Sequence, residues 1–229
     1  EITKKIEKLE KKKLTYPGGV ERLVSTVREE FAQIGRKSEP HVLCELLEIK
    51  DEQWRNAVEG YLNTQRFYVL VEPESFDIAL GTYDRLRREK KAFGVGLINT
   101  QNMEQFEEAP EGTLASVVTS KNRYARRYIN MVLGKVTLCD RYEDLKKYPV
   151  SITRECMRYQ NRVASAIKPD IFNVPFIGSH ALKVQLELAK KKRDQLNEKI
   201  SKLETRLKAM DSVIIPLSTE ADVDVKYRL

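Results

Sequence analysis

The chain has 229 residues, of which 41% are hydrophobic and 33% are charged, so it can bury one good core or two small ones and is too apolar to stay disordered. Its formal net charge of +7 makes a polyanionic partner easier to accommodate than a cationic one. It has no apolar run of about 18 residues and no signal-peptide core, so we expect a cytoplasmic protein with no membrane partner. Because the sequence begins at Glu1 rather than Met, we also expect a piece of a longer protein.

Residues 1–15 predict a helical arm. Ile2, Ile6 and Leu9 follow one another at intervals of four and three residues among lysines and glutamates, which is the spacing of a coiled-coil seam. Tyr16-Pro17-Gly18-Gly19 ends this helix, and a second helix runs to Gly35. The expected inward face of the second helix consists of Val20, Leu23, Val24, Val27, Phe31 and Ile34.

From residue 41 onward the predicted strands and helices alternate, which is α/β order. The predicted strands are 41–49, 67–71, 93–98, 135–139, 150–154 and 158–166. The predicted helices are one capped by Asp51, one over 74–90 and one over 121–132. Segment 106–113 contains Pro110 and Gly112 and is the best internal boundary, so we expect two subdomains, 16–108 and 109–178.

Residues 179–210 predict a second arm. The seam positions are Leu182, Leu186, Ala189, Arg193, Leu196, Ile200, Leu203, Leu207 and Met210, at intervals of four and three. So narrow a stripe needs a partner helix, although a single amphipathic helix packed on a globular core is the alternative. We expect the two arms to pair antiparallel as a stalk, with the positions from Leu196 onward lacking a partner because the upstream helix is truncated. Residues 211–229, which include Pro216, are expected to form a tail without regular structure.

The residues give no strong sign of catalysis or cofactor binding. Gly134-Lys135 lacks both the preceding glycine and the following Ser or Thr of a P-loop. Gly94 and Gly96 lie on a predicted strand, where close packing of the backbone is the expected use. His41 and Cys44 form one pair at zinc-ligand spacing without a second pair, so we expect no metal.

The cysteines are Cys44, Cys139 and Cys156, which are odd in number, far apart and flanked by apolar residues. This pattern predicts buried free thiols in a reducing compartment. A catalytic cysteine–histidine couple with His41 or His180 as the base is the open alternative, but nothing in the sequence favours it. We therefore expect a segment that is not an enzyme and holds no cofactor.

Two stretches of the sequence resemble the hinge domain of SMC proteins. Residues 41–62, HVLCELLEIKDEQWRNAVEGYL, followed by 65–71, QRFYVLV, follow the order of those hinges: a strand ending in Leu-Leu-Glu-Val or similar, Asp-Glu, a helix of the form Ala-Val-Glu-x-x-Leu, and a strand. Residues 125–140, ARRYINMVLGKVTLCD, are similar to the helix, Leu-Gly and strand that open the second half of the hinge. The resemblance covers about residues 16–180 and both arms. It implies an α/β hinge of two small subdomains on an antiparallel coiled coil.

The resemblance also implies partners. A hinge joins two SMC chains, here as a homodimer, while ATPase heads in absent regions would bind accessory subunits and move DNA. We expect the dimer contact at Val174, Phe176 and Ile177 and, in the strands of the 150s and 160s, at Met157 and Tyr159. Family hinges end in a glycine-rich segment at the dimer contact, whereas this protein has Val174-Pro-Phe-Ile-Gly178-Ser-His. That departure and the segment 61–67 suggest a bacterial branch similar to the MukB-like subunit of Wadjet plasmid-defence systems.

Basic residues supply candidate DNA contacts. Lys121, Arg123, Arg126 and Arg127 alternate with tyrosines on a predicted helix, and 123, 126 and 127 share a face that could contact successive phosphates. A second expected cluster, where the arms meet the domain, consists of Lys11, Lys12, Lys13 and Lys183. An ordinary solvated surface is an almost equally good interpretation of both clusters.

Two other classes of protein remain open. One is a DNA-binding regulator or enzyme accessory domain that dimerises only through its coiled coil, and the other is a structural spacer without affinity for DNA. The coiled-coil interpretation predicts a monomer when the arm seam is removed. The hinge interpretation predicts that the globular part still dimerises.

Overall fold

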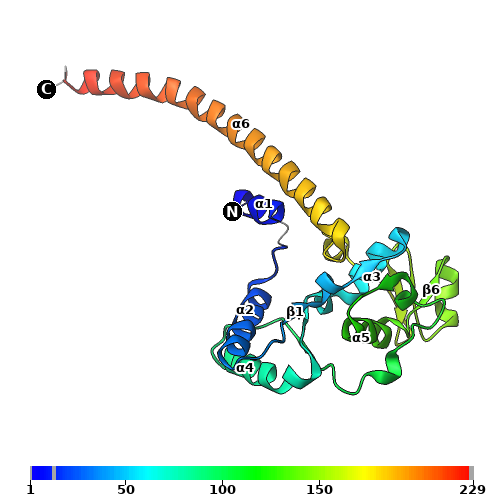
Figure 1. Ribbon diagram of the computed structural model, residues 1–229. Coiled ribbons are helices and arrows are strands. Elements are labelled where there is room, and N and C mark those ends of the chain that lie inside the picture. The colour runs from blue at the N-terminus through cyan, green and yellow to red at the C-terminus, as the bar shows by residue number, and fades with distance from the viewer. Residues whose placement is uncertain (1, 12–13, 227–229) are drawn as a thin grey trace. The chain divides into compact units, whose positions relative to one another are not determined.

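The computed structural model describes the backbone of residues 2–11 and 14–226 and the side chains of residues 2–11 and 14–212 (Figure 1). The protein divides into two compact units. One, which we call the arm unit, contains Glu1–Lys11 and Leu186–Leu229; the other, which we call the body, is Lys12–Gln185.

The arm unit contains α1 (Ile2–Glu10) and most of α6 (Ser179–Lys226). Lys190 Nζ on α6 lies 3.2 Å from Glu10 Oε1 on α1, and Ile6, Leu9 and Ala189 are all buried. The two ends of the sequence therefore belong to one unit, as their matching spacing predicts, while their antiparallel direction stays a prediction. The apolar seam residues from Leu196 onward are exposed, from 38% at Leu196 to 63% at Leu207, so they are not buried against other described residues.

The prediction of an irregular tail from residue 211 is wrong over most of its length, because α6 continues to Lys226. Residues 227–229 lie outside the described residues. Helix formation is cooperative, so a helix nucleated over the heptads extends into adjoining sequence without needing the same periodicity.

The body begins with α2 (Gly18–Gln33), whose stripe at helical spacing packs inward. Val20, Leu23, Val27 and Phe31 are buried as predicted, but Ile34 is 51% exposed. Gly35 ends the helix with φ = +68°, and Arg36 N–H donates to Phe31 C=O at 2.8 Å, which closes the last turn.

Five short strands form two small sheets in the first part of the body. In the three-stranded sheet, β3 (Val69–Leu70) lies between β1 (His41–Val42), antiparallel to it, and β4 (Leu97–Ile98), parallel to it. In the second sheet, β2 (Glu48–Ile49) pairs antiparallel with β5 (Val118–Thr119). The predicted strand 41–49 is thus interrupted by a 3₁₀ turn, η1 (Leu43–Leu46). Leu43 and Cys44 are both buried, so this apolar run does not alternate as a half-buried strand would.

Between α2 and α6, the described part of the body contains three α-helices: α3 (Arg55–Leu62), α4 (Phe76–Arg88) and α5 (Arg123–Leu133). The predicted cap at Asp51 is present, since its Oδ1 accepts from Gln53 N–H in the turn before α3. Asn122 caps α5, because its Oδ1 accepts from Tyr124 and Ala125 N–H at 3.0 Å. The remaining 3₁₀ turns are η2 (Glu52–Trp54), η3 (Asn63–Phe67), η4 (Pro73–Ser75), η5 (Glu104–Phe106), η6 (Leu114–Val117), η7 (Tyr142–Lys147) and η8 (Pro169–Ile171).

The last part of the body carries a four-stranded sheet in the order β6-β7-β8-β9. Its strands are β6 (Thr137–Cys139), β7 (Val150–Thr153), β8 (Met157–Gln160) and β9 (Val163–Ala166). β6 and β7 run parallel, and the other neighbours are antiparallel. The predicted single strand 158–166 is wrong: Asn161 and Arg162, with φ of +53° and +63°, reverse the backbone as a two-residue hairpin loop.

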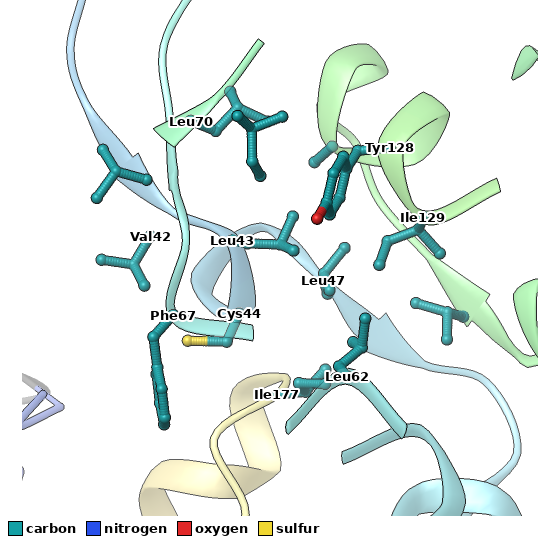
Figure 2. Close-up of a cluster of buried hydrophobic side chains, with 14 of the residues drawn as sticks. Val42, Leu43, Cys44, Leu47, Leu62, Phe67, Leu70, Tyr128, Ile129 and Ile177 are labelled. Carbon is teal, nitrogen blue, oxygen red and sulfur yellow. The ribbon is translucent and has the colours of Figure 1, made fainter. Parts of the chain in front are cut away.

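One cluster of buried side chains draws on both predicted subdomains. Figure 2 shows Leu43 and Leu47, which precede residue 108, meeting Tyr128 and Ile129 from α5 and Ile177 from the segment that leads into α6. The subdomain boundary at 108/109 stays a prediction. The α/β fold class is confirmed, and so are the three free, buried cysteines. Among the described residues, no helix has the length and apolarity needed to span a membrane.

Candidate dimerisation edge and basic surfaces

β9 is an edge strand of the four-stranded sheet, and no strand of the described residues pairs with its outer side, so we call it the open edge. The opposite edge strand, β6, is covered over part of its length by residues 112–114, since Leu138 N–H donates to Gly112 C=O at 2.9 Å and Leu114 N–H donates to Val136 C=O at 2.8 Å. β9 reads Val-Ala-Ser-Ala and contains no charge and no proline, the residues that usually protect an edge strand. Val163 is 60% exposed, and Ala164 and Ala166 are exposed as well. An uncharged, exposed edge of this kind is a template for another strand.

The hairpin register fixes which backbone groups of β9 face outward. Gln160 pairs with Val163, and the ladder continues until Ile167 N–H donates to Cys156 C=O at 3.0 Å. Because hydrogen-bonded and non-hydrogen-bonded pairs alternate in an antiparallel ladder, Ala164 and Ala166 occupy non-hydrogen-bonded positions. Their N–H and C=O groups therefore point away from β8, toward the open edge.

The five residues predicted for the dimer contact have different environments. Met157 is 36% exposed and Tyr159 and Val174 are partly exposed, so all three can contact a partner. Phe176 is partly buried against Phe67, at a ring-centroid distance of 4.7 Å. Ile177 is 0% exposed and lies in the core of its own protomer, so the prediction that it meets a second protomer is corrected.

A buried carboxylate holds the segment that leads into α6. Glu59 is 0% exposed; its Oε1 accepts from the backbone N–H groups of Phe176 and Ile177, each at 2.7 Å, and its Oε2 lies 2.7 Å from Arg66 Nη1. Arg55 Nη1 donates to Ile177 C=O at 2.7 Å. The segment is therefore fixed by charged side chains from α3 and η3 and is not a free loop at the surface.

Glu48 caps the start of α6. Both of its carboxylate oxygens accept from Ser179 N–H, at 3.0 and 3.2 Å, across 131 positions of sequence. The preceding Gly178 has φ = +83°, and a Cβ at that position would lie 2.6 Å from Glu48 Oε2. A side chain at 178 must therefore displace the carboxylate from the helix end.

We expect Gly178→Ala to destabilise the protein more than Gly94→Ala does. Both glycines have positive φ, but a Cβ on Gly94 meets nothing within 4 Å. Both variants place an alanine in a backbone conformation of positive φ, which only glycine adopts without strain. Gly178→Ala also loses the Glu48 cap of α6, and a helix cap contributes about 0.5–2 kcal/mol to stability. Urea unfolding measures the difference. Equal losses would show that the Glu48 cap contributes nothing.

The predicted basic face of α5 is partly engaged within the protein. Arg126 Nη1 donates to the C=O groups of Ala115, at 3.2 Å, and Val118, and burial lowers the pKa of Arg126. Arg127 forms ion pairs with Glu107, at 2.9 Å, and Glu104, at 3.5 Å.

The other two residues of this cluster are exposed. Arg123 lies over the ring of Tyr124, 4.7 Å from its centroid, and donates to the Tyr124 hydroxyl at 2.6 Å. Lys121 has no hydrogen bond or ion pair with the described residues. Lys121 and Arg123 are thus the members of the cluster that could meet a phosphate.

The second predicted basic cluster divides between the two units. Lys11 is exposed in the arm unit, and Lys183 is exposed in the body. Lys12 and Lys13 lie outside the described residues.

The comparisons with known proteins define the class of the fold. No protein-family model matches the sequence, and no curated protein matches it. The structure is similar to the SMC hinge domain of Geobacillus stearothermophilus, solved as an asymmetric dimer, with a TM-score of 0.54 and 14% identity over 93% of this protein and 89% of that domain. It is also similar to the S. pombe Smc5/6 hinge domain, with a TM-score of 0.51 and 13% identity over 96% and 95% of the two proteins. The protein has the fold of an SMC hinge domain.

Proposed function

We propose that this protein is the dimerisation hinge of an SMC-like ATPase and joins two copies of itself through the edge of β9. The observation that carries the proposal is the open, uncharged β9 edge in a fold similar to SMC hinges. Two outward N–H and C=O pairs, flanked by exposed Val163 and Met157, offer backbone hydrogen bonds and apolar contact together. The Geobacillus hinge in the comparison was solved as a dimer, which supports the same association here.

The mass of the 229-residue protein in solution, measured by sedimentation equilibrium, tests this proposal. The hinge function predicts the mass of two copies at micromolar concentration. A monomer at every concentration tested would overturn it.

The arm seam separates the hinge from the rival in which only the coiled coil dimerises. We expect Leu203→Glu/Leu207→Glu to leave the dimer intact, because both residues are more than 60% exposed and the proposed contact lies in the body. A coiled-coil dimer would instead dissociate, since charges at seam positions repel across it. Light scattering gives the mass, and Lys202→Glu/Arg206→Glu, off the seam on the same helix, is the matched control.

We further propose that Lys121 and Arg123 contact DNA while the hinge holds the ring closed. The support is that these two cations are exposed and keep their charge available, whereas Arg126 and Arg127 are engaged. Each phosphate contact contributes about 0.9 to the salt slope of binding to duplex DNA. We therefore expect Lys121→Gln/Arg123→Gln to lower the slope by up to about 1.8.

Fluorescence anisotropy with labelled duplex DNA over a salt series measures that slope. Arg88→Gln, on α4 and paired with Asp84, is the control. If the control lowers the salt slope equally, the DNA is attracted by the overall positive charge of the protein and not by Lys121 and Arg123. If the protein does not bind DNA at low salt, the proposed DNA contact is contradicted.

The wider assembly belongs to the same proposal. The ATPase heads and the accessory subunits would lie in regions beyond these 229 residues, so catalysis would take place outside this segment. The assembly would act in the cytoplasm. The segments 61–67 and 174–180 favour a branch similar to the MukB-like subunit of Wadjet plasmid defence.

A further inference from the structure

A cavity of about 420 Å³ opens in the body between the C-terminal end of α3 and the segment that follows β9. Tyr61 and Tyr68 contribute to one part of its lining, and Arg158 and Lys168 to another. The two walls are packed closely at Gly60, where an added Cβ would lie 3.2 Å from Ile167 Cγ2. The cavity is therefore built by contacts between α3 and the segment after β9, and all of its lining lies within the body.

The charge of the lining is entirely positive. It contains two cationic side chains and no aspartate or glutamate. The carboxyl end of α3 adds only about half a negative charge, which two full positive charges outweigh. Two other cavities of the body are balanced by acids: one sets Glu74 and Glu104 beside its two arginines, and the other sets Glu21 and Glu45 beside Arg28 and His41. The α3 cavity is thus suited to an anion.

The polar groups around this cavity are available. Among the described residues, neither the hydroxyls of Tyr61 and Tyr68 nor Lys168 Nζ make a hydrogen bond or ion pair. Arg158 makes one long contact, 3.4 Å from Nη2 to Ser165 Oγ. Burial raises the pKa of Tyr61 while the charge of Arg158 acts to lower it, so the guanidinium lies near a phenol that stays protonated at neutral pH.

We propose that this cavity binds one nucleoside phosphate unit, either a free mononucleotide or a nucleotide within a single strand. Arg158 and Lys168 would hold the phosphate by charge-assisted hydrogen bonds. Tyr61 and Tyr68, with the apolar side chains of Ile167 and Ile171, would contact the base, because an aromatic face stacks on any base. The site is separate from Lys121 and Arg123 and does not depend on dimer formation.

Anisotropy of fluorescein-labelled single-stranded oligothymidine tests the proposal on the whole 229-residue protein. Lys168 is exposed, so Lys168→Gln should fold normally and weaken binding by about tenfold, the effect of losing one charge-assisted hydrogen bond. Tyr61→Leu keeps an apolar side chain and removes the ring, and should also weaken binding by about tenfold. Lys146→Gln, an exposed lysine outside the cavity lining, should bind as the unmodified protein does.

Competition identifies the source of the nucleotide. Displacement of the probe by thymidine monophosphate supports a free nucleotide, and binding of the oligomer alone supports a single strand. Displacement by inorganic phosphate as effective as that by thymidine monophosphate would overturn the role of the base, and equal losses for Lys146→Gln and Lys168→Gln would overturn the cavity. Light scattering on each variant gives its oligomeric state independently of oligothymidine binding. A protein that is a monomer and still binds oligothymidine would contradict the hinge proposal and leave the cavity proposal standing.

Discussion

Ala164→Pro is expected to convert the dimer to a monomer. The N–H of Ala164 points away from β8, so proline removes a donor from the open edge without breaking the β8–β9 ladder. Each lost hydrogen bond is worth about 1 kcal/mol, and the change occurs in both protomers of a homodimer, so the dissociation constant should rise by about 30-fold or more. Sedimentation equilibrium measures this constant.

Ala164→Ser is the matched control for this substitution. It retains the N–H and should leave the dissociation constant unchanged. At a protein concentration low enough for the unmodified protein to be monomeric too, both variants should unfold at the same urea concentration as it does, because the monomer does not use this N–H. If the dimer of Ala164→Pro has the same dissociation constant as that of the unmodified protein, the β9 edge is not the contact.

Glu59→Ala is expected to cause the largest loss of stability. It leaves the Arg66 side chain, 7% exposed, without its counter-ion, and it leaves the part-buried N–H of Phe176 and the buried N–H of Ile177 without an acceptor. Breaking a buried pair by removing one partner costs about 3–5 kcal/mol. The free energy of unfolding in urea, extrapolated to water, measures the loss.

The double variant Glu59→Ala/Arg66→Met separates charge from hydrogen bonding. It leaves no unpaired charge, and methionine keeps apolar contact with Phe67 and Phe176, whose ring centroids lie 4.8 and 5.0 Å from Arg66 Cζ. We expect it to be more stable than Glu59→Ala alone. If the two are equally unstable, the backbone hydrogen bonds to Phe176 and Ile177 account for the whole effect.

The parts of the fold that the sequence predicted are those with a local cause. α2 and α5 have an inward stripe at helical spacing together with a stop or a cap, at Gly35 and Asn122. The run 41–49 has no such period. Residues of a 3₁₀ turn and of a strand can be equally apolar, so the sequence does not show that a turn divides this run into two strands. The hairpin at 161–162 was missed since Asn-Arg lacks the glycine that usually marks a two-residue turn.

The site residues show a different limit. Ile177 was predicted to lie at the dimer contact because an apolar residue after a loop has the same sequence signal in a core and in an interface. Arg126 is directed to two backbone C=O groups, which no charge pattern records. The α3 cavity joins Tyr61 to Arg158 and Lys168 across about a hundred positions, and neither segment alone suggests it.

Because all three native thiols are buried, we expect the unmodified protein to react little with thiol-directed labelling reagents. Burial raises the pKa of Cys44, of Cys139 and, to about 11, of Cys156, so little thiolate is present at neutral pH to react with a maleimide. A cysteine introduced at an exposed position of β9, such as Ala166, would then be the principal reactive group. Bifunctional reagents could thereby measure the spacing between two joined protomers without any native cysteine being replaced.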